Sequence, residues 1–243
     1  MAQDSKNPMY SGISQLSKVE ENLENYNQFI VKKILNWIPN RNRLTMTMDF
    51  GAGSGSLAAI FRAETGISPI CVEIDPKLTK LLREGGFKHR NNLSGISNYF
   101  DFAYSSNVLE HIEKDQLAIN EIFNSLTPGA YFAIYVPAFE LLFSKMDESV
   151  GHVRRYSKSE LVKKVRNADF TIVNVEFVDS IGFFASLLAR VLKFDSTSST
   201  GSSSALRIYD RWVFPVSRTL DLLGFKRILG KNLFLVARKD PVS

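Results

Sequence analysis

The strongest chemical signal in the sequence is a glycine-rich segment that begins with an acidic residue. Glycines have no Cβ, so such a backbone can approach a ligand closely, and a carboxylate can accept hydrogen bonds from both hydroxyls of a ribose. The pattern therefore predicts a nucleoside-binding site. The segment reads Asp49-Phe50-Gly51-Ala52-Gly53-Ser54-Gly55, and Glu73, at the end of the next predicted strand, is the expected ribose ligand.

Two residues of this region indicate which nucleoside ligand would bind. The nicotinamide-binding pattern Gly-x-Gly-x-x-Gly requires a third glycine at the position of Ser56. The Asp49 carboxylate would repel a pyrophosphate and attract an ammonium group. A ligand that is adenosyl at one end and cationic at the other is S-adenosylmethionine, which we expect as the cofactor. Two alternatives stay open: an NAD(P)-dependent oxidoreductase or epimerase, and a cofactor-binding protein without catalysis.

Two histidines and a basic-aromatic cluster are candidates for deprotonating and binding a methyl acceptor. Methyl transfer from a sulfonium needs in-line approach, and a hydroxyl acceptor must also lose a proton. His111 and His152 are the candidate general bases, because imidazole titrates near neutral pH. Arg154 and Arg155 could hold a phosphate or carboxylate through paired hydrogen bonds, and with Tyr156 they form the predicted substrate-binding group.

These candidates lie at the ends of alternating strands and helices, which the spacing of apolar residues indicates. This alternation is typical of a doubly wound, Rossmann-like α/β sheet with helices on both faces, whose ligands bind outside the carboxyl ends of the strands. The predicted strands are 44–50, 68–74, 87–96, 101–106, 130–136, 170–177 and 232–237, and the predicted helices are 17–37, 56–62, 77–83, 115–126, 157–167, 181–194 and 206–223.

Length and pattern predict one domain with an insertion. Its expected parts are an N-terminal helical cap (1–40), a cofactor-binding core (41–180), a helical insert (181–230) and a last strand (231–239). Residues 127–129 are predicted to form a turn, and the serine-threonine tract 196–204 a flexible linker. Residues 138–156 have no clear period, and long connections of this kind usually carry function.

Three motifs together resemble the class I S-adenosylmethionine-dependent methyltransferases. They are the glycine-rich segment, Val72-Glu73-Ile74-Asp75, and Ser106-Asn107-Val108-Leu109-Glu110-His111-Ile112, which is similar to the branch that includes quinone-biosynthesis methyltransferases. The resemblance spans about residues 25–180 and implies a seven-stranded, mostly parallel sheet whose last strand is antiparallel.

The same resemblance implies roles for individual residues. Asp49 would hold the methionyl ammonium, directly or through water, and Glu73 would clamp the ribose diol. The segment 91–94 would lie near the adenine. The full set of expected cofactor-binding residues is Asp49, Gly51, Ala52, Gly53, Gly55, Glu73, Ile74, Asn92, Leu93 and Asn107.

Further resemblances bear on metal and acceptor. Some quinone-type relatives bind a divalent metal through Glu-x-x-Glu-His, whereas Asn107-x-x-Glu110-His111 has one carboxylate fewer, so no metal is expected. The short motifs 151–156, 209–211 and 230–233 are similar to bacterial methyltransferases found among surface-polysaccharide functions. They favour a small-molecule or lipid-linked acceptor, methylated at oxygen by direct displacement.

Composition narrows the classes of partner and compartment. The 243 residues include a single cysteine and show no leader or membrane-spanning apolar run, so we expect a cytoplasmic protein. The net charge of +5 is not gathered into long basic runs, and no nucleic-acid partner is expected. Aromatic and basic residues alternate in the insert 181–230, which leaves room for peripheral contact with a membrane. Oligomeric state does not follow from the sequence.

Overall fold

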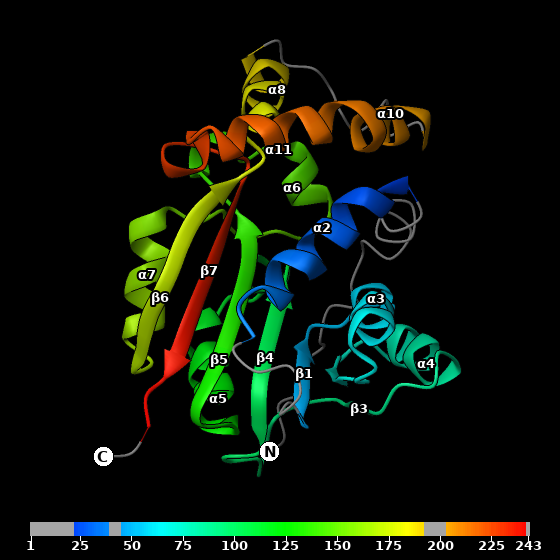
Figure 1. The fold of residues 1–243 in the computed structure, drawn as a ribbon, viewed down its shortest axis with the longest axis vertical. Coiled ribbons are helices and arrows are strands. Elements are labelled where there is room, and N and C mark those ends of the chain that lie inside the picture. The colour runs from blue at the N-terminus through cyan, green and yellow to red at the C-terminus, as the bar shows by residue number, and fades with distance from the viewer. Residues whose placement is uncertain (1–21, 39–44, 192–202, 242–243) are drawn as a thin grey trace, which may run out of the picture.

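The computed structural model describes residues 22–38, 45–191 and 203–241. A single seven-stranded sheet forms the centre, with helices against both of its faces and a further group of helices beyond the carboxyl ends of the parallel strands (Figure 1). Within the described residues, no helix is both long and apolar enough to span a bilayer.

The strand order is β3-β2-β1-β4-β5-β7-β6. Strands β1 to β5 pair in parallel, and β7 is antiparallel to both of its neighbours, which confirms the predicted doubly wound sheet with an antiparallel last strand. The carboxyl ends of β1, β2 and β4 therefore meet at one edge. The strands are β1 Thr47–Phe50, β2 Ile70–Val72, β3 His89–Arg90, β4 Phe100–Ser106, β5 Leu126–Pro137, β6 Phe170–Val178 and β7 Asn232–Lys239.

Helices bury apolar stripes on each face of the sheet. Against one face, α2 (Glu24–Leu35) and α3 (Ser56–Thr65) pack on aromatic side chains of β4 and β5, and α4 (Pro76–Glu84) packs beside α3. Against the other face lie α5 (Asp115–Ser125) and α7 (Lys158–Arg166). Burying these stripes is the main driving force that holds the layers together.

The predicted insert forms a cap of helices: α8 (Ser180–Val191), α10 (Ser203–Ile208), a π-helical turn η4 (Tyr209–Val213), α11 (Phe214–Leu222) and η5 (Phe225–Arg227). In Figure 1 this cap lies beyond the carboxyl end of β5. Buried aspartates attach it: Asp210 accepts hydrogen bonds from two backbone N–H groups of α2, at Asn25 and Tyr26, with distances of 2.9 and 2.8 Å.

Several local predictions need correction. The predicted turn 127–129 lies inside β5, because Leu126 pairs with Phe100 and a register irregularity absorbs the extra residues. The strand predicted at 87–96 is only two residues long. The segment 138–156 contains two short helical pieces, η3 (Glu140–Leu142) and α6 (Lys145–Ser149). The start of the first predicted helix and the predicted linker 196–204, apart from its last two residues, lie outside the described residues.

Candidate active site

The glycine-rich turn between β1 and α3 has a backbone that only glycine adopts readily. Gly51 and Gly55 have φ values of +76° and +88°. A Cβ on Gly51 would lie 2.3 Å from a methyl carbon of Val108, and one on Gly55 would lie 2.7 Å from a methyl carbon of Leu82. The turn is therefore held tightly between the β4 loop and α4, and its N–H groups stay near the sheet edge.

Asp49, at the floor of this turn, is a buried acid with an unsatisfied oxygen. Its side chain is 2% exposed, and Oδ2 has no hydrogen-bond partner among the described residues. Burial, assisted by the nearby negative charge of Glu73, raises the pKa of Asp49 to about 7. A cation in contact with such a buried and incompletely hydrogen-bonded carboxylate would stabilise its ionised form.

Glu73 follows β2 and connects the glycine turn to the residues that come after β2. Its Oε2 accepts a hydrogen bond of 2.9 Å from the N–H of Gly53, and its Oε1 accepts from the N–H groups of Ile74 and Asp75 at 2.8 and 3.0 Å. Burial raises the pKa of Glu73 despite these bonds. The carboxylate is thus fixed beside the glycine turn, as a ribose ligand must be.

The other predicted cofactor residues follow strands of the same sheet. Ile74 comes after β2 with 65% of its surface exposed, and Asn92 and buried Leu93 come after β3. Asn107 comes after β4, with φ +55° and a backbone N–H bonded to the carbonyl of Tyr135 at 2.8 Å. The parallel topology places these segments along one edge with the glycine turn.

The two predicted bases, which are far apart in sequence, lie side by side in the structure. The rings of His111, from η2 (Leu109–His111), and His152, from the loop after α6, have centroids 4.6 Å apart. Nε2 of His152 lies 3.8 Å from Oε1 of Glu110. The ligand atoms of these three residues lie within 4.8 Å of one another, a spacing that a single metal ion could bridge.

Burial sets the protonation of this cluster. Glu110 is fully buried, and burial raises its pKa to about 7. Burial and the neighbouring His152 together lower the pKa of His111 to about 4. Near neutral pH the His111 imidazole is therefore uncharged and can act as a ligand for a cation, whereas Glu110 is the member of the cluster able to take up a proton.

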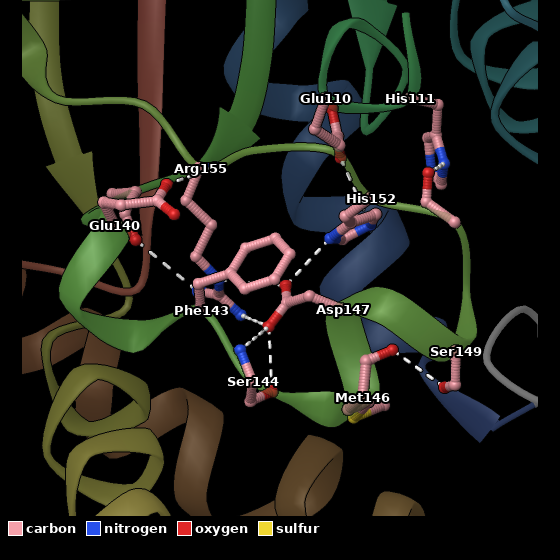
Figure 2. Close-up of polar contacts among 12 residues, drawn as sticks. Glu110, His111, Glu140, Phe143, Ser144, Met146, Asp147, Ser149, His152 and Arg155 are labelled. Atoms are coloured by element: carbon pink, nitrogen blue, oxygen red, sulfur yellow. Dashed lines mark hydrogen bonds and ion pairs between the residues drawn. The ribbon is translucent and has the colours of Figure 1, made fainter.

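Asp147, in α6, was not among the predicted site residues, yet it orients His152. Its Oδ1 lies 2.8 Å from Nδ1 of His152 and accepts a 2.9 Å hydrogen bond from Nε of Arg155 (Figure 2). Burial alone would raise its pKa, but His152 and Arg155 together hold the pKa of Asp147 well below its ordinary value. The Ser144-x-x-Asp147 spacing is visible in the sequence, but it indicates only the capping box that Asp147 also forms.

The predicted substrate-binding group is engaged with the protein itself. Arg155 is 8% exposed and paired with Asp147, whereas Arg154 pairs with Asp115 at 2.7 Å, so the two guanidinium groups do not converge. The hydroxyl of fully buried Tyr156 donates to Asp115 at 2.7 Å. These three side chains fix the loop that carries His152.

The structure thus combines a Rossmann-like sheet with a glycine-rich turn beside the carboxylates of Asp49 and Glu73 and with a histidine cluster after β4. Residues 20–175 match the methyltransferase domain family. This is more than half of the chain, and the chain belongs to that family. A search of curated proteins found no match.

Solved structures share the fold at low identity. An S-adenosylmethionine-dependent methyltransferase from Archaeoglobus fulgidus has 19% identity and a TM-score of 0.58 over 88% of this chain and 94% of its own. A 1,6-didemethyltoxoflavin N1-methyltransferase from Burkholderia thailandensis, solved with S-adenosylhomocysteine, has 18% identity and a TM-score of 0.57 over 95% and 84%. The [4+2]-cyclase SpnF has 16% identity and a TM-score of 0.58 over 97% and 98%.

These findings support an S-adenosylmethionine-dependent methyltransferase rather than the nicotinamide alternative. The cyclase among the similar structures shows that the fold alone does not fix the reaction. The reaction depends on the side chains at the site.

Proposed function

We propose that this methyltransferase binds S-adenosylmethionine in the glycine-turn crevice, with Asp49 on the methionyl ammonium and Glu73 on the ribose. The observation that carries the proposal is the buried, incompletely hydrogen-bonded Asp49 carboxylate. A cation is the partner that such a group lacks, and the ammonium of the cofactor supplies one. The glycine turn and the residues after β2, β3 and β4 would contact the rest of the cofactor.

We propose a hydroxyl as the methyl acceptor, on a small molecule or a lipid-linked molecule. The acceptor oxygen attacks the methyl carbon in line, the C–S bond breaks, and the hydroxyl proton passes to the cluster of Glu110, His111 and His152. The support is that a buried cluster able to take up a proton lies directly after β4, at the edge that carries the predicted cofactor residues. An amine that binds as the free base needs no such group.

The cap supports a lipid-linked acceptor and peripheral contact with a membrane. Large apolar side chains are exposed on α8, η4 and α11, beside exposed arginines of η4 and α11. Apolar and basic residues on one surface suit the interface of an anionic membrane. The exposed apolar residues include Phe184, Leu188, Val191, Trp212, Val216, Leu222 and Leu223.

Calorimetric titration of the purified protein with S-adenosylhomocysteine tests the cofactor assignment, with NADH titrated in parallel. We expect a micromolar dissociation constant for S-adenosylhomocysteine, which corresponds to about −8 kcal/mol, and no binding of NADH. Binding of NADH alone would mean that the glycine turn has been misinterpreted. Binding of S-adenosylhomocysteine then justifies an acceptor screen that starts with saccharide-lipid and quinol extracts.

A further inference from the structure

The buried Glu110 carboxylate is the least satisfied acid of the described chain. Neither of its oxygens has a hydrogen-bond partner within the residues that the structure describes, although the side chain has no exposed surface. An unpaired buried carboxylate costs several kcal/mol unless a charge or donor meets it. Nε2 of the His152 imidazole lies 3.8 Å from Oε1 of Glu110, and Figure 2 shows Glu110 and Asp147 on opposite sides of that imidazole.

Each of the two imidazoles is held by a contact to its Nδ1 atom, as in many metal-bound histidines. Nδ1 of His152 lies 2.8 Å from the Asp147 carboxylate, and Nδ1 of His111 lies 3.2 Å from the carbonyl oxygen of Gly151. Metal-binding histidines usually donate their second ring N–H to a carboxylate or backbone carbonyl, which fixes the tautomer and presents the other nitrogen to the ion. Each ring can then present Nε2 as a ligand.

We propose that Glu110, His111 and His152 bind a divalent transition-metal ion, with Asp147 as a positioning residue for His152. Two imidazole nitrogens and one carboxylate oxygen suit Zn²⁺, Co²⁺, Mn²⁺ or Fe²⁺, whereas Mg²⁺ and Ca²⁺ prefer oxygen ligands alone. No metal was expected from the sequence because the motif around His111 lacks one carboxylate, and the third ligand proposed here comes from the separate loop after α6.

The site is inferred from geometry, and only the role of the ion rests on the proposed function. A bound ion would hold the acceptor hydroxyl and lower its pKa, so that the proton leaves to solvent water. The oxygen then forms its bond to the methyl carbon while the C–S bond of the cofactor breaks. With the ion bound, Glu110, His111 and His152 would be its ligands, and solvent water would replace them as the acceptor of the hydroxyl proton.

Titration with Co²⁺ tests the site, because the visible absorption of bound Co²⁺ reports its ligands independently of activity. The full-length protein, without an affinity tag and stripped with a chelator, should bind one equivalent of Co²⁺. Zn²⁺ should displace the Co²⁺, and excess Mg²⁺ should not. Glu110→Gln and His152→Ala should each weaken binding at least tenfold, and Asp147→Asn should weaken it about 10- to 100-fold.

His89→Ala is the matched control, since His89 is the third histidine of the chain and lies in β3, outside the cluster. It should leave Co²⁺ binding unchanged. Titration with S-adenosylhomocysteine separates the two proposals: a wild-type protein that binds this ligand but no Co²⁺ overturns the metal site alone. Co²⁺ binding that is equally strong in Glu110→Gln and His152→Ala, when both variants keep wild-type melting temperatures, would also overturn it.

Discussion

Two groups of buried carboxylates in this molecule differ in their surroundings. In the cap, Asp221 accepts from the N–H groups of Asp179 and Ser180, and Asp179 in turn accepts from Gly182, Ser217 and the hydroxyl of Tyr209. At the carboxyl edge of the sheet, Asp49 and Glu110 are equally buried but retain oxygens without hydrogen-bond partners among the described residues.

The acids of the cap hold the fold, and we connect the unpaired oxygens of Asp49 and Glu110 with the binding of a ligand. Satisfied buried carboxylates lower the free energy of the folded state and tie helices together, because every donor around them is paired. Unsatisfied ones raise it by about 1–3 kcal/mol each or more. A chain tolerates that cost most readily where a bound cation later removes it, which is the role proposed for both Asp49 and Glu110.

The largest effect is expected in the cap, where Asp179→Ala should destabilise the protein. The substitution leaves the Gly182 N–H and the Ser217 hydroxyl buried without their acceptor. We expect a loss of about 3 kcal/mol or more in the free energy of unfolding and a fall in melting temperature on the order of 10 °C. Thermal and urea denaturation measure both quantities.

Asp240→Ala is the control for this variant, because the Asp240 carboxylate is half-exposed and bonded to Thr171 and Arg238 at the surface. It should leave the melting temperature essentially unchanged. Loss of S-adenosylhomocysteine affinity in a still-folded Asp179→Ala would show that the cap acids also serve the site, which contradicts the division drawn above.

The opposite result is expected for Asp49→Asn, which should impair binding and spare stability. The amide keeps the shape of the carboxylate but cannot pair with an ammonium, so the affinity for S-adenosylhomocysteine should fall by about 2 kcal/mol, or some 30-fold. Asp101→Asn is the matched control, because Asp101 lies at the start of β4 and accepts hydrogen bonds from residues 45 and 46. Calorimetry should show unchanged affinity in that variant.

Much of the fold could be predicted from the sequence because local pattern and topology agree. Alternation in β1, apolar runs in β4 and β7, and the glycine turn after β1 led to the parallel sheet, and the family resemblance implied its antiparallel last strand. Strand β3 was overestimated, because a two-residue edge strand has too few residues for alternation to mark its ends. The turn predicted at 127–129 was wrong, because pairing with β4 outweighed the local preference of Pro128 and Gly129.

The candidate site also has one part that could be predicted from the sequence and one part that could not. Asp49, Gly53 and Glu73 follow or end two neighbouring parallel strands, so the predicted topology placed them at one edge of the sheet, and the Gly53 N–H is indeed bonded to Glu73. The neighbourhood of His111, Asp147 and His152 depends on how the loop after β5 folds back on η2, where the Val153 N–H bonds to the carbonyl of Glu110 at 2.9 Å. No periodic pattern encodes such a tertiary contact, so Asp147 went unnoticed.

The smallest effect, and the most direct test of the Asp49 charge, is the pH dependence of cofactor affinity. A cationic ammonium binds the ionised carboxylate, and the pKa of Asp49 in the ligand-free protein is about 7. Affinity for S-adenosylhomocysteine should therefore rise about tenfold, or about 1.4 kcal/mol, from pH 6 to pH 8. The sign is opposite for stability: because the folded state holds a proton that the unfolded chain has released, the contribution of Asp49 to stability falls as pH rises from about 4 to 7. Calorimetry at matched ionic strength should show this rise in the wild type and a flat profile in Asp49→Asn, whereas parallel profiles in the two proteins would place the titrating group elsewhere.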